Sequence, residues 1–486
     1  MFHKISEKYN ALPVPVRASF FFIFTGALKD AVDVLTTPIF TRMLTLEEYG
    51  LFNVYNSWFQ IIRIIITLYL FGDGFSVGMS RFSDDKEGFT SSQQGLVTVL
   101  FLFWSALALV FRKQVAALLG LGSGLIALMF CQSFFQTPLN CWQQKERYDY
   151  RYQRLTPVIV AYFILQPLVG IVLICLNSHG YNNGLIRIYS GVGVQIAFGV
   201  TVYILQFIRR PVFFDKKYWA FSIKTNSALA PHYMSQVLLN QSDRLMINAF
   251  VGAAQTSIYS VAHAAAFTLS VIVNNVNATF VPWLYESLKM KKTGGVRRIS
   301  SLLVVFSAFV AMMLVLIAPE AMLILGGGKY AEGKWLIPPL SFSVYLIFVY
   351  SMFSDVEMFY GKNIYVLISS IVGATSNILL NYLMIPRLGY FVAGYTTVAG
   401  YLLMCLGHYF FLELTCRKEE IHVSELFHMP LICGVSLVLA ALSGLIMLLY
   451  RTVILRYCIF LVFATGLIWK RKSLLAFYHR LKNDHV

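Results

Sequence analysis

Long apolar segments alternate with short polar loops along almost the whole chain. A transmembrane helix needs roughly 20 mostly apolar residues, and about fourteen segments have this character. They begin near Ala18, Leu51, Gln93, Gly122, Leu155, Leu185, Ala228, Ile258, Ile299, Trp335, Tyr365, Val392, Phe427 and Thr452. Gln132 and Gln136 interrupt the fourth segment, and the last two are barely separated. The pattern predicts an all-α polytopic membrane protein with about twelve to fourteen spans.

Composition and charge support a membrane protein. Hydrophobic residues make up 58% of the chain and charged residues 13%, against about 25% charged residues in soluble domains. The net charge is +16, and Lys and Arg are about three times more frequent in the loops on the N-terminal side than in the opposite loops. This bias predicts a cytoplasmic (inner) membrane location with both termini cytoplasmic. Nucleic-acid binding is excluded, because the positive charge is not concentrated on one face.

The chemistry of enzymes and metal proteins has no sequence signature here. The seven cysteines form no CxxC motif and no Cys/His cluster, so neither a disulfide framework nor a metal site is predicted, and no cofactor is expected. The first apolar segment is too long for a signal-peptide core and contains charges, so we expect it to be retained as a span.

A weak internal repeat relates the two halves of the chain. Asp33 and Asp243 lie about 210 positions apart, as parallel repeats of a transporter would place equivalent residues. The same offset relates Leu35 to Leu245, Phe40 to Phe250 and Tyr49 to Tyr259. We therefore predict two six-helix lobes, residues 1–208 and 227–413, related by a pseudo-twofold axis along the membrane normal. A basic cytoplasmic linker, residues 209–226, would join them, and residues 414–486 would add two helices and a basic tail.

Several spans carry polar faces that lipid would not tolerate. At about 100° per residue, polar residues in spans one, two, seven and eight each fall on one side of their helix. We nominate as a substrate-binding cavity the residues Lys29, Asp33, Asn56, Gln60, Arg63, Asn240, Asp243, Arg244, Asn274 and Asn277. Polar faces can also simply hold helices together. Lys29 and Asp33 can neutralise each other at i, i+4, and Asp243 with Arg244 can form an internal pair.

The cations Lys29, Arg63 and Arg244 indicate the charge of the ligand. Arginine presents a planar fork that suits phosphate. Surrounded by Asn and Gln, these cations suit a head group that is both anionic and rich in hydroxyls. A cavity for organic cations would instead favour acids and aromatic residues.

Two stretches resemble a known family. TTPIFTRMLTLEEYGLFNVYNSW (residues 36–58) and LLNQSDRLMINAFVGAAQTSIYSVAHAAA (residues 238–266) resemble signatures of the O-antigen-type polysaccharide-repeat flippases. These belong to the multidrug/oligosaccharidyl-lipid/polysaccharide exporter superfamily. Residues 319–330 and 385–395 are similar to the family more weakly, so the resemblance covers most of the chain in order.

The resemblance implies two lobes that form a V around a cationic cavity and work by alternating access. The implied substrate is an undecaprenyl-diphosphate-linked oligosaccharide, moved from the cytoplasmic to the outer leaflet for O-antigen, capsule or exopolysaccharide assembly. The implied partners are that lipid-linked oligosaccharide, membrane lipid, and a polysaccharide polymerase and glycosyltransferases. Asp243 and Arg244 match the family pattern directly.

Three other functions are weighed against a flippase of this kind. An ion-coupled antiporter for drugs or small molecules and a peptidoglycan-precursor flippase share the superfamily and stay open as alternatives. A glycosyltransferase or polymerase should carry paired carboxylates on a large outward loop. The acidic residues assigned to outward loops are scattered over short segments, so we predict that the protein is not an enzyme.

Overall fold

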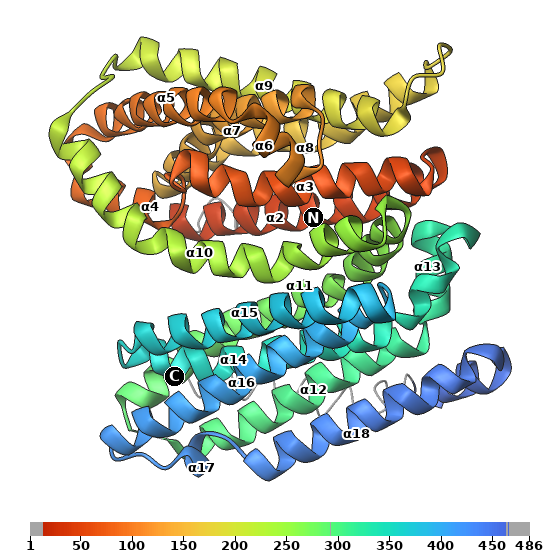
Figure 1. Ribbon diagram of the computed structural model, residues 1–486. Helices are drawn as coiled ribbons and strands as arrows, with labels where there is room; N and C mark the ends of the chain where they lie inside the picture. Colours follow the sequence, from red (N-terminus) through yellow and green to blue (C-terminus); the bar gives the residue numbers. More distant parts are fainter. Residues whose placement is uncertain (1–12, 292, 463–464, 466–486) are drawn as a thin grey trace, which may run out of the picture. The chain divides into compact units, whose positions relative to one another are not determined.

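The computed structural model describes residues 13–291, 293–462 and 465. Over these residues every regular element is a helix, which confirms the all-α prediction (Figure 1). The basic tail predicted beyond Val462 and the start of the chain before Pro13 lie outside the described residues, apart from residue 465.

The chain forms two compact units. Of the described residues, the first unit contains 13–260 and 381–390, and the second contains 261–291, 293–380 and 391–462. The helices of the first unit are α2 (Val14–Met43), α3 (Leu46–Thr67), α4 (Asp73–Arg81), α5 (Lys86–Val110), α6 (Arg112–Leu119), α7 (Ser123–Tyr148), α8 (Tyr152–Cys175), α9 (Asn183–Arg209) and α10 (Lys216–Phe250). The predicted lobes and their pseudo-twofold relation stay a prediction.

Helices α11 (Ala253–Lys289) and α15 (Asn363–Leu388) begin in one unit and end in the other. The second unit also contains α12 (Val296–Leu316), α13 (Ala318–Gly326), a 3-10 helix (Gly328–Trp335), α14 (Ile337–Phe359), α16 (Val392–Lys418), α17 (Val423–Leu426) and α18 (Met429–Leu448). A shorter apolar helix, Val453–Val462, follows them.

Nine described helices are long and apolar enough to cross a membrane, or ten if α6 and α7, bent by 90°, make one span. Three further long helices, α2, α3 and α10, fall short because charged and polar residues interrupt their apolar sequence. The multi-pass prediction is confirmed, while the count of fourteen is not. Those three helices carry eight of the ten nominated residues.

Local signals explain where α3 begins and ends. Thr45 and Glu48 form a capping box: the Thr45 hydroxyl accepts from the Glu48 amide at 3.2 Å, and the Glu48 carboxylate accepts from the Thr45 amide at 2.9 Å. At the other end Leu68 and Tyr69 adopt φ values of 49° and 51°, a left-handed conformation that stops the helix. The chain then leads directly into α4.

The core of the first unit is apolar with one polar connection. Tyr55 and Phe59 of α3 pack with residues of α6, α7 and α9. The Tyr55 hydroxyl donates to Gln132 Oε1 at 2.7 Å, and Gln132 Nε2 donates to Gln195 Oε1 at 3.0 Å. The glutamine that interrupts the fourth apolar segment is therefore a buried link between α3, α7 and α9, which satisfies polar groups that lipid could not.

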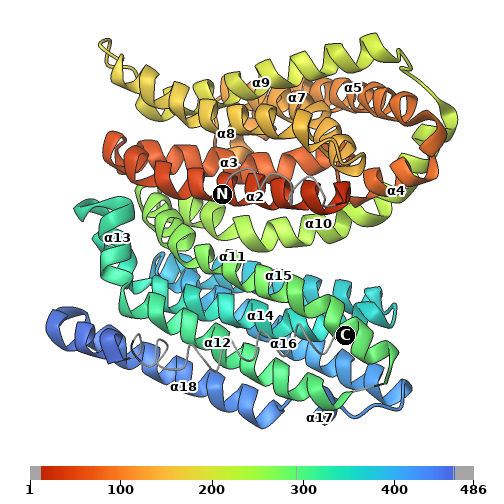
Figure 2. The same ribbon diagram turned by 180° about the vertical axis from the view of Figure 1, so that it is seen from behind.

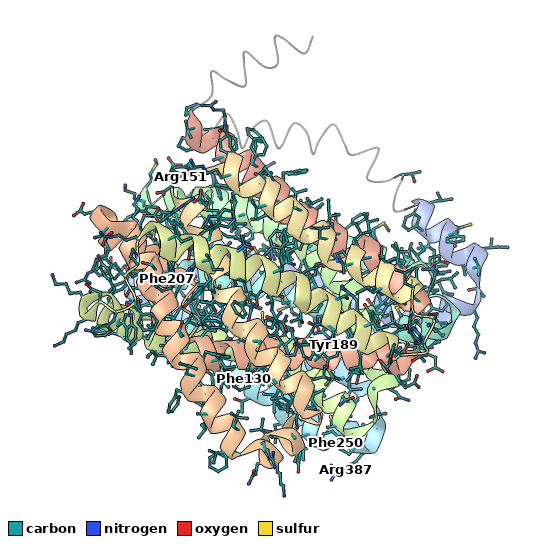
Figure 3. The ribbon with its side chains drawn as sticks, turned by 90° about the horizontal axis from the view of Figure 1, so that it is seen from above. Phe130, Arg151, Tyr189, Phe207, Phe250 and Arg387 are labelled. Carbon is teal, nitrogen blue, oxygen red and sulfur yellow. The ribbon has the colours of Figure 1, made fainter. Side chains whose placement is uncertain are left out.

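The last turns of α15 belong to the first unit. The Tyr382 ring lies 5.8 Å from the ring of Phe250 at the end of α10, and Figure 3 shows Phe250 and Arg387 at the same end of the molecule. Asn381, the residue before Tyr382 in α15, is fully buried. A segment near the end of the sequence thus reaches a candidate site residue on α10, described below.

Helix α14 is the centre of the second unit. It packs against α12, α16 and α18, and these four helices lie side by side in both views (Figures 1 and 2). Of the most apolar 18-residue stretch of α14, 78% is buried, compared with 22% for the corresponding stretch of α18. A helix covered on all sides can hold ionisable groups away from lipid, and α14 holds two acids in its last two turns.

Candidate functional site

The nominated residues of α2 are paired with each other. Lys29 Nζ lies 3.2 Å from Asp33 Oδ2 and 3.6 Å from Asp30 Oδ1. The Lys29 and Asp33 side chains are 53% and 69% exposed. This is the i, i+4 neutralisation that their spacing allows, and with Asp30 included the three side chains carry a net charge of −1.

Arg63 of α3 has different surroundings. Its guanidinium carbon lies 5.9 Å from the ring centre of Phe59, 6.0 Å from that of Tyr69 and 5.3 Å from that of Phe71. Among the described residues no side chain forms an ion pair or hydrogen bond with it, and its Nε is buried without a partner. Asn56 and Gln60, on the same face, are half-buried.

The nominated residues of α10 form a hydrogen-bonded network. Asp243 is buried and accepts hydrogen bonds from the Tyr259 hydroxyl and from Asn381 Nδ2, each at 2.5 Å. Arg244 donates to Gln241 Oε1 at 2.8 Å and to the carbonyl of Asn240 at 3.2 Å. These contacts show how α10, α11 and the end of α15 are held together in the first unit.

The last two nominated residues lie on α11 in the second unit. Asn274 is exposed. Asn277 donates to Asp355 Oδ2 of α14 at 3.0 Å. The structure therefore brings together eight nominated residues within the first unit and places these two in the second.

A pocket of about 280 Å³ in the first unit was not predicted from the sequence. We call it the α7 pocket; it is lined by Tyr69, Phe71, Gly72, Asp73, Asn140, Gln143, Gln144, Arg147 and Tyr233. Four of these residues share one face of α7, because positions 140, 143, 144 and 147 follow the helical period. That spacing was visible in the sequence, but this stretch was assigned to the end of a span and its loop.

Charge and aromatic rings define the chemistry of the α7 pocket. The Tyr233 hydroxyl donates to the Asp73 carboxylate, and the rings of Tyr233 and Tyr69 lie 4.3 Å apart. The Arg147 guanidinium lies 5.8 Å from the Phe22 ring centre, and its Nε is buried without a partner among the described residues. Arg63 lies directly behind Tyr69 and Phe71. The pocket therefore has amide, hydroxyl and carboxylate groups beside two arginines that lack an acidic partner in the described chain.

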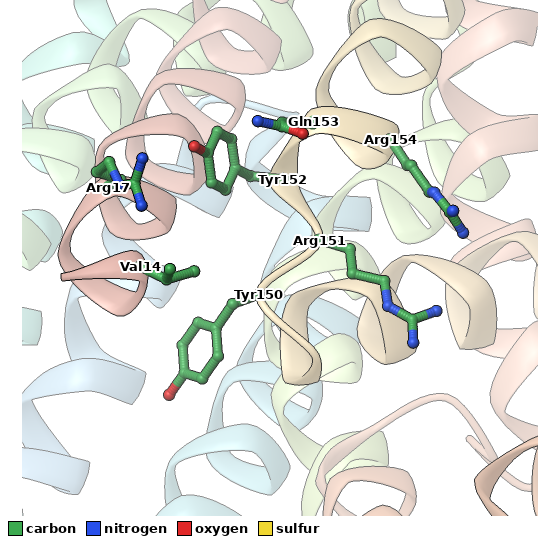
Figure 4. A pocket seen from close by; sticks show the side chains of 7 residues that line it. All are labelled: Val14, Arg17, Tyr150, Arg151, Tyr152, Gln153 and Arg154. Atoms are coloured by element: carbon green, nitrogen blue, oxygen red, sulfur yellow. The ribbon is translucent and has the colours of Figure 1, made fainter. Parts of the chain in front are cut away.

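A second pocket of about 360 Å³ is lined by Val14, Arg17, Tyr150, Arg151, Tyr152, Gln153 and Arg154. Figure 4 shows Arg17 on one side, with Arg151 and Arg154 extending away from it on the other. Arg151 also lies 3.5 Å from the Asp149 carboxylate. Because the three guanidinium groups do not converge, this pocket is a weaker candidate for anion binding than the α7 pocket.

Nine or ten helices of the described residues are long and apolar enough to cross a membrane, which defines a polytopic membrane protein. A family model described as "Polysaccharide biosynthesis protein" matches residues 16–288, more than half of the 486-residue chain. The chain belongs to this family, and with it to the multidrug/oligosaccharidyl-lipid/polysaccharide exporter superfamily. The resemblance drawn from the sequence is confirmed.

Known proteins agree with this assignment. A protein of the Lsg locus of Haemophilus influenzae is 24% identical over 364 residues, covering 68% of this chain and 82% of that protein. The fold is similar to that of the lipid II flippase MurJ in an inward closed conformation, with a TM-score of 0.63, 14% identity, and coverage of 94% of this chain and 100% of that one. An inward-facing multidrug transporter of the superfamily gives a TM-score of 0.59 at 12% identity, with coverage of 80% and 95%.

Proposed function

We propose that the protein is a flippase that moves a polyprenyl-diphosphate-linked oligosaccharide from the cytoplasmic to the outer leaflet. The observation that carries the proposal is an amide-lined pocket with Arg147 in its wall and with Arg63 against two of its lining rings, Tyr69 and Phe71. Neither arginine has an acidic partner among the described residues. A diphosphate is the anion that arginine forks bind best, and sugar hydroxyls bond to amide and carboxylate groups. Family membership supports the same reading.

The proposal includes the setting of transport. The protein would lie in the inner membrane with both termini cytoplasmic and serve the assembly of a surface polysaccharide such as O-antigen, capsule or exopolysaccharide. Glycosyltransferases would supply its substrate, and a polysaccharide polymerase would use the product. Alternating access between the lobes of residues 1–208 and 227–413 would carry the head group across, while the polyprenyl tail stays in lipid.

The test is complementation of a deletion strain of the source bacterium. Arg63→Ala and Arg147→Ala should each abolish surface polysaccharide at a normal protein level in the membrane, and lipid-linked oligosaccharide should accumulate. Arg63→Lys should rescue only in part, because the bidentate fork is lost. The matched control is Arg112→Ala, at an exposed position that begins α6. Wild-type polysaccharide in both alanine variants would overturn the proposal.

Two further assays separate the alternatives. If the protein is a peptidoglycan-precursor flippase, its expression should rescue cells depleted of their own lipid II flippase. If it is a drug antiporter, its expression should lower the accumulation of organic cations in the deletion strain. Lower accumulation of organic cations is not expected, because Arg147 and the amide groups of the α7 pocket suit an anionic head group rich in hydroxyls. Growth rescue decides between the two lipid-linked substrates.

A further inference from the structure

Two ionisable side chains meet in the interior of the second unit, far along the chain from the α7 pocket. Glu357 of α14 and His408 of α16 both have 0% exposed side chains. His408 Nδ1 lies 2.9 Å from Glu357 Oε2. Both helices are among those apolar enough to cross a membrane. The pair is therefore closed off from water in this structure.

Each partner has an unused hydrogen-bonding atom. Glu357 Oε1 and His408 Nε2 are buried and have no hydrogen-bond partner among the described residues. Burying a carboxylate in an apolar interior is costly unless it is paired or protonated. With one shared proton the pair is neutral overall, as a carboxylate with an imidazolium or as a carboxylic acid with an imidazole. A second proton makes it cationic, and the free Oε1 is an available place for that proton.

The surroundings of the pair include further titratable groups. On α14, the Tyr350 ring stacks on the His408 ring at 5.4 Å with a 9° angle between planes, and Asp355 lies close enough to His408 for a charge on the histidine to act on the carboxylate. Cys405, three positions before His408 on α16, lies near Cys433 of α18. Tyr285 of α11 lies near Asp355.

The other neighbouring helices contribute uncharged groups. Helix α11 contributes Asn277, bonded to Asp355, and α15 places Ser369 against Gly407, next to His408. Helix α12 presents an apolar and hydroxyl face that includes Val304 and Ser307.

Asp355 is more exposed than the Glu357–His408 pair. Its side chain is 8% exposed, whereas Glu357 and His408 are completely buried. Asp355 and Glu357 stand two positions apart on α14, so their side chains leave different sides of the helix, and Asp355 is the more exposed of the two acids. Proton exchange with Glu357 requires α14 and α16 to separate or water to enter between them.

We propose that the Glu357–His408 pair is a proton-binding site that couples proton movement to the transport cycle. The proton would bind when the interior opens to one side and leave when it opens to the other, because occupancy changes the charge of a buried core by one unit. Such a site can shift the equilibrium between two conformations only through a different proton affinity in each. The coupling role rests on the proposed flippase function, whereas the proton site itself does not.

The first experiment uses the purified full-length protein in lipid and the proton as the probe. Infrared difference spectra recorded between about pH 5 and about pH 9 should show a carboxylic-acid band that appears on acidification. Glu357→Gln should remove the band, and His408→Gln should move its midpoint by about one pH unit or more. Glu413→Gln, at an exposed pair with Arg417 on the same helix α16, is the matched control and should keep the band.

Should Glu357→Gln fail to fold, Glu357→Asp keeps a carboxylate and should shift the band. A wild-type protein without a titrating band, or a Glu357 variant in which the band is unchanged, would overturn the proton site.

The second experiment tests coupling in everted membrane vesicles of the deletion strain expressing the protein. Flipping is measured as protection of endogenous lipid-linked oligosaccharide from periodate added outside. An imposed pH gradient should change the wild-type rate by about tenfold and leave the Glu357→Gln rate unchanged, while Glu413→Gln should follow wild type. Equal sensitivity to the gradient in wild type and Glu357→Gln would overturn the coupling. Absence of any wild-type flipping would instead contradict the proposed function and leave the infrared titration to decide on the proton site.

Discussion

Arg63 in the first unit and the Glu357–His408 pair in the second are two different ways of keeping charge inside apolar helices. Arg63 is half-buried, surrounded by aromatic rings and next to an amide-lined pocket, with no acidic partner among the described residues. Glu357 and His408 are fully buried and satisfy each other. The first arrangement is suited to an anion from outside the protein, while the second can exchange nothing larger than a proton or water.

The two arrangements should also respond differently to mutation, one mainly in transport and the other mainly in stability. An intramembrane charge without a partner is costly to keep, so its retention indicates a ligand. A buried pair is strongly disrupted when one partner is removed, yet replacing both partners is often close to neutral for stability. Mutations at the two places should therefore affect different measurements.

The largest effect on stability is expected at the buried pair. Glu357→Leu or His408→Leu alone should lower the free energy of unfolding by about 3–5 kcal/mol, because one ionisable group remains buried without its partner. The double variant should recover most of this loss, which a double-mutant cycle in detergent would measure. Additive losses in the double variant would show that the two side chains do not act as a pair.

Replacing Asp243 should have an intermediate effect on stability. The experiment tests whether Asp243 resembles the mutually satisfied Glu357–His408 pair or Arg63, which has no acidic partner among the described residues. Asp243→Leu removes the hydrogen bonds from Tyr259 and Asn381, and each hydrogen bond contributes about 0.5–1.5 kcal/mol to stability. Thermal unfolding should show a clear loss of stability at the contact of α10 with α15. Unchanged stability with lost transport would place Asp243 with Arg63 instead. Glu413→Leu is the matched control, because its pair with Arg417 is exposed and lies along α16.

The sequence predicted the helical architecture well because apolar length and loop charge are local properties. It also nominated Arg63, since a cation on a polar face of a span is visible in one segment, and that nomination stays a prediction. It did not find the α7 pocket, where Tyr233 joins residues of the α3–α4 connection and α7. Nor did it find the Glu357–His408 pair, although both residues stand inside predicted spans, because partners 51 positions apart are brought together only by packing.

A smaller effect on stability is expected at Arg63. Arg63→Met keeps the length and the contact with the rings but removes the charge, so the free energy of unfolding should change by less than about 1 kcal/mol. Transport should be lost at the same time. A protein destabilised as strongly as the single variants of the buried pair would show that Arg63 has a structural partner, and the contrast between the two regions would disappear. Unfolding and polysaccharide assays on the same preparations decide between these results.

The smallest effect is expected where an acid–base pair is reachable by water. Glu320 of α13 accepts hydrogen bonds from Arg456 and from the Tyr457 hydroxyl, at 2.5 Å and 2.8 Å. Partial burial alone would raise the pKa of Glu320, but these hydrogen bonds outweigh it and lower the pKa below its usual value. A lowered pKa contributes stability that is present above about pH 4.3, the usual Glu value, and is lost as the pH falls through the folded value. The melting temperature of wild type should therefore fall slightly more between pH 7 and pH 4 than that of Glu320→Gln, by about one degree, because the Glu320 side chain is 30% exposed and solvent screens its charge, although Arg456 is buried. A much larger difference in melting temperature would mean that the Glu320–Arg456 pair affects stability as strongly as the Glu357–His408 pair. The exposure of the acid would then not explain why the two pairs differ.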